Sequence, residues 1–171
     1  MKKIVLIILF LTSIFLWGQD RFVLAGGYGT ADVDSFEHEI YTFRLAGKNQ
    51  STFIGIDYDL LIYEDDFIES EYSEKLTNSN IHEISFLFGK SMPFGRYSSV
   101  NFNGGISVIR KLEKFEQSNL PEKKRKDFGF PIDATIDIGI FKNLGVSFRA
   151  KKSYNDIAPY FGYSAMLQFI F

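Results

Sequence analysis

The chain has 171 residues, no cysteine and a formal net charge of −2 at pH 7. The lack of cysteine excludes a disulfide framework and a lipid-modified cysteine, and the small net charge gives no reason to expect nucleic acid as a partner. Aromatic residues make up 17% of the chain, with 19 Phe and 9 Tyr, which is high for a soluble domain and typical of a lipid-facing surface.

The N-terminus has the layout of a secretory signal. Two lysines precede an apolar run from Ile4 to about Trp17, and the small residue Gly18 follows. Roughly 14 apolar residues fall short of the ~20 that a membrane-spanning helix needs, which disfavours a retained anchor. We therefore expect a cleaved signal peptide at residues 1–18 and a single barrel domain at residues 19–171.

Alternating apolar and polar residues predict eight strands in the rest of the chain. The predicted strands cover residues 21–30, 38–47, 52–63, 81–91, 98–112, 130–141, 144–153 and 160–171. The clearest alternation runs from Ile132 to Ile140, where Asp133, Thr135 and Asp137 take the other face. Eight is an even number, as a closed antiparallel barrel made from one chain requires.

The connections between these strands alternate in length. The odd-numbered connections are long and polar, at residues 30–37, 64–80, 113–129 and 154–159, and the even-numbered ones are brief, at residues 48–51, 92–97 and 142–143. Short periplasmic turns and longer outer loops are the expected asymmetry of transmembrane barrels. Both chain termini are therefore expected on the periplasmic side.

Alternation alone does not show which face of the sheet is wet, because a soluble lipocalin-type barrel has the same period with its apolar face inward. The volume of the side chains decides this point. Roughly thirty large apolar side chains share one face, whereas the interior of an eight-stranded barrel is just wide enough for side chains to fill. The opposite face carries small residues such as Gly27, Gly55 and Gly145. The sequence therefore predicts an all-β, eight-stranded antiparallel up-and-down transmembrane β-barrel, with a lipid-facing apolar exterior and a packed polar lumen.

Eight charged residues fall on the predicted inner face. They are Arg44, Asp57, Asp59, Glu83, Asp133, Asp137, Arg149 and Lys151. A charge in so narrow a lumen is costly unless it is paired and hydrogen-bonded, so we expect a lumen charge network. The simplest role of such a network is to plug and stiffen the barrel. The alternative is a proton or ion path, or a gated pore.

The hairpin of residues 130–153 permits a prediction of its register. If Phe141 pairs with Gly145 around a three-residue turn, Asp137 lies directly opposite Arg149, within cross-strand contact distance. We therefore predict an ion pair between Asp137 and Arg149.

The last predicted strand ends in an aromatic residue. Tyr163, Leu167, Phe169 and the terminal Phe171 share one face of it. Together with the N-terminal signal and the eight alternating segments, this ending resembles the small outer-membrane β-barrel superfamily, which includes the OmpA transmembrane domain, OmpX-like proteins and the PorT-like barrels of Bacteroidota. The resemblance covers the whole mature chain. It implies that these four residues form an assembly signal that the barrel-assembly machinery reads.

Enzymes occur among small outer-membrane barrels, so histidines at the rim are catalytic candidates. Lipid A acyltransferases and deacylases of this type use a His with a Ser and an acidic residue near the membrane rim. His38 and His82 lie near the outer ends of predicted strands, and Ser35, Ser70 and Ser73 fall on the same side. Neither enzyme motif is present around them. We therefore expect no catalytic residue.

Two of the long connections are charged. Residues 64–74 contain six carboxylates whose spacing does not match a calcium loop, so we expect no metal site and no cofactor. Lys123, Lys124, Arg125 and Lys126 form a predicted basic loop, which is expected to be hydrated. Its alternative contacts are lipopolysaccharide phosphates or the neighbouring acidic loop.

These observations predict a monomeric, non-enzymatic integral protein of the outer membrane of a Gram-negative bacterium, exported through its cleaved signal peptide. Its expected role is structural or surface interaction through four extracellular loops. The expected partners are outer-membrane lipid and lipopolysaccharide, the barrel-assembly machinery, and an extracellular protein that binds the loops or adds a strand to a rim extension such as residues 107–115. The alternatives are an enzyme that modifies lipid A or phospholipid, a small pore, and a soluble lipocalin-like barrel.

Overall fold

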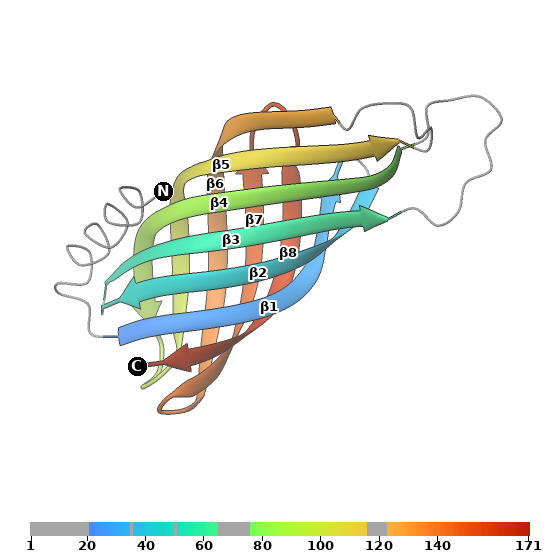
Figure 1. Ribbon diagram of the computed structural model, residues 1–171. Helices are drawn as coiled ribbons and strands as arrows, with labels where there is room; N and C mark the ends of the chain where they lie inside the picture. The colour runs from blue at the N-terminus through green and yellow to red at the C-terminus, as the bar shows by residue number, and fades with distance from the viewer. Residues whose placement is uncertain (1–20, 35, 50, 65–75, 116–122) are drawn as a thin grey trace, which may run out of the picture.

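The computed structural model describes residues 21–34, 36–49, 51–64, 76–115 and 123–171. The described residues form eight strands, which are β1 (Arg21–Val33), β2 (Phe36–Lys48), β3 (Thr52–Glu64), β4 (Leu76–Pro93), β5 (Ser99–Phe115), β6 (Lys123–Phe141), β7 (Leu144–Tyr154) and β8 (Tyr160–Ile170). Each strand pairs antiparallel with the next along the chain, and β8 pairs with β1, which closes the barrel (Figure 1). The predicted fold class is therefore confirmed.

The two ends of the barrel differ. β1 begins and β8 ends at one end, which we call the terminal end, and β1, β3, β5 and β7 run toward the other, which we call the loop end (Figure 1). The predicted signal peptide of residues 1–18 and the acidic segment of residues 65–74 lie outside the described residues. Among the residues that the structure describes, no helix is long and apolar enough to cross a membrane.

Strands β4, β5 and β6 are longer at the loop end than the sequence predicts. They contain 18, 17 and 19 residues, compared with 11 to 13 in the other five strands. β5 and β6 stay paired out to Glu113 and Lys123, in segments that read as a polar loop. Backbone pairing with a neighbour holds these charged residues in strands although they lack an apolar face. The three strands thus form a projecting sheet at the loop end.

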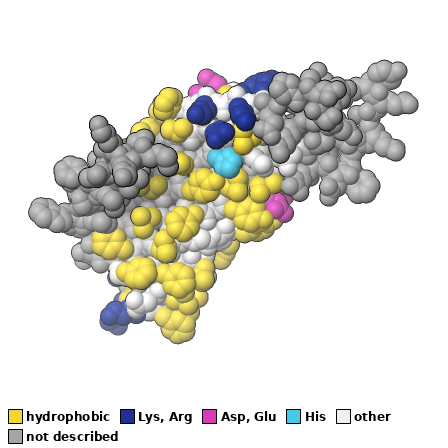
Figure 2. All heavy atoms as spheres, viewed as in Figure 1, with side chains coloured by type: hydrophobic (Ala, Val, Ile, Leu, Met, Phe, Trp, Pro, Cys, Tyr) yellow, Lys and Arg dark blue, Asp and Glu magenta, His cyan; other side chains and the backbone are white. Residues whose placement is uncertain are grey.

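The outer wall of the barrel is apolar, as predicted. Along β6, Ile132, Ile136 and Ile138 are exposed, whereas Asp133 and Asp137 between them are buried. Figure 2 shows hydrophobic side chains spread over the barrel wall. This arrangement fits lipid around the barrel, and the soluble lipocalin-like alternative, which needs the apolar face inside, is wrong.

The lumen is built in three layers, which can be followed along β3. On β3, inward positions run from Phe53 near the terminal end through Asp57 and Asp59 to Leu61 near the loop end. β1, β2, β4 and β8 likewise contribute to both apolar layers, whereas β5 contributes only to the loop-end layer and β6 and β7 contribute to neither. The terminal-end apolar layer contains Val23, Ala25, Ala46, Phe53, Leu87, Met166 and Ile170, and the loop-end apolar layer contains Ala31, Val33, Ile40, Leu61, Ile81, Ile109, Ala158 and Tyr160. Charged side chains fill the layer between them.

The register of the β6–β7 hairpin differs from the predicted one. Phe141 pairs with Leu144 across a two-residue turn, and Gly139 pairs with Gly145, so Ile140 forms a bulge. In the predicted register, a three-residue turn keeps both inner faces aligned. The bulge achieves the same alignment with a shorter turn, because one extra residue in one strand restores the parity of the pairing. The whole hairpin is consequently shifted by two residues from the prediction.

Candidate functional site

The central layer of the lumen contains ion pairs built around Arg44 of β2. Its Nε donates to Asp57 Oδ1 at 2.8 Å and its Nη2 donates to Asp57 Oδ2 at 2.7 Å, which makes a bidentate pair with the neighbouring strand β3. The same Nη2 also donates to Asp133 of β6. A planar guanidinium matched to two carboxylate oxygens is a strong and directional interaction. Arg44 therefore ties β2 to β3 and, across the lumen, to β6.

Arg149 of β7 approaches the same carboxylates from another side of the barrel. Its Nη1 donates to Asp59 Oδ1 at 2.8 Å, and its Nη2 lies 2.8 Å from Asp57 Oδ2. Its Nε donates to Asp133 Oδ2 at 3.2 Å. Two guanidinium groups thus share three buried carboxylates, and four strands meet at this point.

Lys151, Glu83 and Tyr160 extend the network toward the loop end. The Lys151 Nζ lies 2.6 Å from Asp59 Oδ2 and 3.0 Å from Glu83 Oε2. The hydroxyl groups of Tyr160 and Ser153 both donate to the Glu83 carboxylate. Tyr160 also belongs to the loop-end apolar layer, so its ring closes the network on that side while its hydroxyl takes part in it.

Lys48 and Asp137 extend the network toward the terminal end. The Lys48 Nζ forms an ion pair with Asp137, whose carboxylate also accepts a hydrogen bond from Asn101 Nδ2 at 2.6 Å. The Asn101 Nδ2 lies 2.9 Å from the hydroxyl of Thr135. This part of the network runs beside the terminal-end apolar layer.

The network is close to neutral. Its cations are Arg44, Lys48, Arg149 and Lys151, and its carboxylates are Asp57, Asp59, Glu83, Asp133 and Asp137. Four positive and five negative charges leave a formal charge of −1, and neutral donors such as Tyr160 and Asn101 also contact the carboxylates. Removing one member would leave a buried charge unpaired, which is strongly unfavourable. The paired side chains fill the central layer of the lumen.

All eight sequence-predicted lumen charges lie in this network. The predicted ion pair between Asp137 and Arg149 is wrong, because the shifted register places Ser147 opposite Asp137 and Thr135 opposite Arg149. Asp137 pairs instead with Lys48.

Sequence reasoning missed Lys48 and Tyr160. Lys48 falls in a predicted turn, although alternation from Arg44 through Ala46 continues to it on the inner face. Tyr160 likewise shares the inner face of β8 with Gly162 and Ser164. In both cases the signal was the period of two carried to the end of the strand, which is the last residue of β2 and the first residue of β8.

The four residues of the predicted assembly signal face outward on and after β8. Tyr163, Leu167, Phe169 and Phe171 are all exposed. β8 closes the barrel against β1, and the backbone amide of Phe171 donates to the Phe22 carbonyl at 2.9 Å. Their role in assembly remains a prediction.

The two histidines lie on opposite sides of the barrel wall. His38 is buried inside the lumen, where its Nδ1 donates to the Phe36 carbonyl at 3.0 Å and its ring packs against Tyr63. His82 is on the outer wall, where its Nδ1 and the Tyr58 hydroxyl are 2.8 Å apart. Ser35, Ser70 and Ser73 lie outside the described residues. Among the described residues, no hydrogen bond joins either histidine to a serine or a carboxylate.

The basic run predicted as a loop is the beginning of β6. Lys123, Lys124, Arg125 and Lys126 pair with β5 in the projecting sheet. Successive residues of a strand point to opposite faces, so the run is divided between the two sides of the wall. The prediction of a single basic loop is therefore wrong. Which of these cations face outward follows from the residues of β5 with which they pair.

The predicted strand-addition edge at residues 107–115 is also wrong. Over residues 107–113, β5 is paired on one side with β4 and on the other with β6, so its backbone has no free edge there. Residues 123–129 of β6 are paired with β5, but among the described residues no strand pairs with their other side. The open edge of the projecting sheet is therefore on β6, where its lysines discourage unspecific strand pairing.

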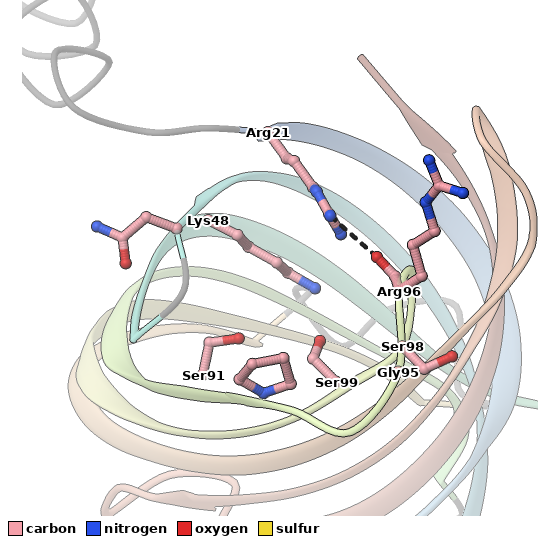
Figure 3. A pocket seen from close by; sticks show the side chains of 9 residues that line it. Arg21, Lys48, Ser91, Gly95, Arg96, Ser98 and Ser99 are labelled. Carbon is pink, nitrogen blue, oxygen red and sulfur yellow. Dashed lines mark hydrogen bonds between the residues drawn. The ribbon is translucent and has the colours of Figure 1, made fainter.

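A cavity of about 140 Å³ lies at the terminal end of the lumen (Figure 3). Figure 3 shows the side chains of Lys48 and Arg21 reaching into this region, with Ser91 and Ser99 among its walls. The Arg21 Nη2 donates to the backbone carbonyl of Arg96 at 3.0 Å. Lys48 lines this cavity and also pairs with Asp137. The cavity therefore adjoins the terminal-end side of the lumen network.

No protein-family model and no curated protein sequence matches the chain. Solved structures match it in fold. Ail, the attachment invasion locus protein of Yersinia pestis, has a TM-score of 0.62 and 11% identity, over 90% of this chain and 99% of that chain. Neisserial surface protein A has a TM-score of 0.65 and 10% identity, over 87% and 96% of the two chains. The N-terminal β-barrel domain of OprF from Pseudomonas aeruginosa has a TM-score of 0.61 and 12% identity, over 90% and 98%.

These similarities confirm, at the level of fold, the resemblance to small outer-membrane barrels. With identities of 10 to 12%, they describe the architecture of the chain. Function has to be argued from its own residues.

Proposed function

We propose that this protein is a non-enzymatic integral protein of the outer membrane that acts at the cell surface through its projecting sheet. The observation that carries this proposal is the contrast between the two parts of the barrel. The lumen is filled by a paired charge network between two apolar layers, whereas β4, β5 and β6 extend beyond the length that the membrane requires.

The strand lengths support a surface role. A transmembrane strand needs about 9–11 residues, so about half of the 19 residues of β6 are not needed to span the bilayer. On this reading the loop end is extracellular, the terminal end is periplasmic, and residues 1–18 are removed on export. The projecting sheet offers cations on both faces and one open edge, which are the elements of an interaction surface.

The structural neighbours agree with this type of role. One is a surface protein and another an attachment invasion locus protein, which has also been crystallised in complex with the heparin analogue sucrose octasulfate. We propose a comparable surface-interaction role here, with a monomeric barrel, no cofactor, and contacts to outer-membrane lipid and lipopolysaccharide. The exposed apolar face of β8, with Tyr163, Leu167 and Phe169, supports recognition by the barrel-assembly machinery.

The proposal is tested by expressing the full chain in a Gram-negative host. We expect it in the outer-membrane fraction, with heat-modifiable migration on gels, and with surface labelling of a tag inserted at residues 116–122. Recovery in the soluble periplasmic fraction would refute an integral barrel. Labelling only after the outer membrane is permeabilised would refute the orientation.

The enzymatic alternative is tested separately by mass analysis of lipid A and phospholipids from cells with and without the protein. We expect identical lipid profiles. A modified lipid that disappears in the variants His38→Ala or His82→Ala would overturn the non-enzymatic proposal.

A further inference from the structure

Cations of β5 and β6 form a patch on the outer wall, directly above the apolar surface. Ile109 is fully buried in the lumen, so its neighbour Arg110 faces outward, and Arg110 pairs directly with Lys126 across the two strands. Lys124 lies one outward position further from the membrane on β6. We call Arg110, Lys124 and Lys126 the outer basic patch. Figure 2 shows a group of Lys and Arg side chains beside a histidine on this face, bordered by hydrophobic side chains.

The arrangement is in register with the apolar surface. One outward step toward the membrane from Arg110 and Lys126 lie Val108 and Phe128, which also pair with each other and are 50% and 76% exposed. Ile84 of β4 continues this row and is 57% exposed. Arg110 and Lys126 of the outer basic patch therefore lie one outward position away from side chains suited to contact with lipid.

Placing two cations directly opposite each other across strands is unfavourable. Side chains in such positions have their Cβ atoms about 4.5–5.5 Å apart, and like charges there repel. Among the described residues, neither Arg110 nor Lys126 forms an ion pair with a carboxylate. An external anion between the two side chains would turn this repulsion into two attractions.

We propose that the outer basic patch binds the phosphate groups of a phosphorylated lipid in the outer leaflet, with lipid A as the source. The position argues for a lipid over a soluble polyanion, because the ligand must present phosphates to Arg110 and Lys126 and acyl chains to Phe128 and Val108 one row below. Arginine and lysine are the usual ligands of phosphate oxygens. This inference rests on the proposed function, since the patch meets the outer leaflet only if the loop end is extracellular.

The test compares two double variants, each of which removes one arginine and one lysine from neighbouring positions. Arg110→Gln with Lys126→Gln removes the outward pair. Lys123→Gln with Arg125→Gln removes one lysine and one arginine from the same basic run but on the other face of the wall. Each full-length protein is folded, checked for heat-modifiable migration, and reconstituted in phosphatidylcholine nanodiscs that contain small amounts of bisphosphorylated lipid A. Retained lipid A is measured by mass spectrometry after purification.

We expect the native protein and the Lys123 and Arg125 variant to retain lipid A equally, and the Arg110 and Lys126 variant to bind it at least about tenfold more weakly, which corresponds to about 1.4 kcal/mol. The charge-conserving exchange Arg110→Lys with Lys126→Arg should retain binding, and its binding can be measured even if the neutral variant fails to fold. Equal retention by all variants would overturn the proposal. So would equal binding of dephosphorylated lipid A.

A soluble polyanion is a further outcome of the same experiment. If heparin binds the detergent-folded protein through Arg110 and Lys126 and displaces lipid A, the patch serves a soluble ligand and the lipid assignment is wrong. These measurements use purified protein in nanodiscs, so they are independent of fractionation. A protein absent from the outer membrane would refute the proposed function while leaving lipid binding measurable.

Discussion

At the scale of single residues, Arg149 carries the largest share of the buried charge pairing. It contacts Asp57, Asp59 and Asp133, which come from β3 and β6. The side chains of these carboxylates are fully buried, between the two apolar layers. Breaking a buried ion pair by deleting one partner leaves the other charge uncompensated.

We therefore expect Arg149→Met to destabilise the barrel by about 3–5 kcal/mol. The matched control is Lys152→Met, which removes the cation of a neighbouring residue that faces outward over the Tyr154 ring. That change should cost less than about 1 kcal/mol. Urea unfolding of the two variants in lipid vesicles measures both effects, and similar losses at the two positions would contradict a structural role for the network.

The identity of the Asp137 partner is also decided at this scale. The structure pairs Asp137 with Lys48, whereas the register derived from sequence pairs it with Arg149. A double-mutant cycle with Asp137→Asn, Lys48→Met and Arg149→Met separates the two. We expect a coupling free energy of about 1–3 kcal/mol between Asp137 and Lys48, and a clearly smaller one between Asp137 and Arg149. The reverse order would mean that the hairpin register is incorrect.

At the scale of elements, each strand has to contact lipid with one face and fill a crowded lumen with the other. On β6 the adjacent residues Thr135 and Ile136 illustrate this division, because the first is buried and contacts Asn101 while the second is exposed. Substitutions at these two neighbouring positions should therefore have unequal effects on the stability of the barrel.

We expect Ile136→Arg to cost roughly 2–4 kcal/mol, because it places a charge on the lipid side near mid-depth. Thr135→Ser keeps the hydroxyl group that contacts Asn101 and should be mild. Comparing the unfolding free energies of the two variants in the same vesicles tests the assignment. A mild Ile136→Arg beside a costly Thr135→Ser would mean that the faces are exchanged.

Strand β1 supplies a second prediction for an element, because it passes very close to β8. A Cβ added at Gly29 would lie 1.8 Å from the Tyr163 carbonyl oxygen, whereas a Cβ at Gly26 would meet nothing within 4 Å. Gly29→Ala should therefore disturb the closing pair of strands and cost about 1–3 kcal/mol. Gly26→Ala should fold like the native chain. Folding yields on gels and unfolding free energies measure the difference, and a tolerated Gly29→Ala would show that β1 and β8 can separate without loss.

At the scale of the whole molecule, the layered lumen determines whether the barrel conducts. The loop-end apolar layer contains Leu61, Ile81 and Ile109, which are fully buried. An eight-stranded barrel has only enough interior for side chains, and here they are charged pairs sealed by apolar residues. An ion entering the lumen would have to displace both.

We expect the reconstituted protein to show no defined conductance steps in planar bilayers at moderate voltage. A larger outer-membrane porin in the same bilayers provides the positive control. Reproducible steps from the native protein that vary with the Arg149→Met change would support a pore through the lumen and would remove the plug interpretation.

Much of the fold was predictable because its signals are local. The period of two identifies strand faces directly from adjacent residues such as Thr135 and Ile136, and the even strand count and short turns imply closure. The eight predicted lumen charges followed from the same alternation. Lys48 was missed because the predicted strand ended at residue 47. Tyr160 lies inside its predicted strand and was missed because the predicted network contained only charged residues. His38, which the sequence places near the outer end of a predicted strand, is inside the lumen.

The sequence by itself determined the strand count, the two faces of the wall and the membership of most of the lumen network, because each of these depends only on alternation along a single strand. The tertiary structure decided which charges meet, where β4, β5 and β6 end, and which edge and which cations the projecting sheet exposes. These features depend on pairing between strands. One bulge at Ile140 shifts a hairpin by two residues and gives Asp137 a different partner, and backbone pairing keeps Lys123 to Lys126 in a strand that their side chains alone would not indicate.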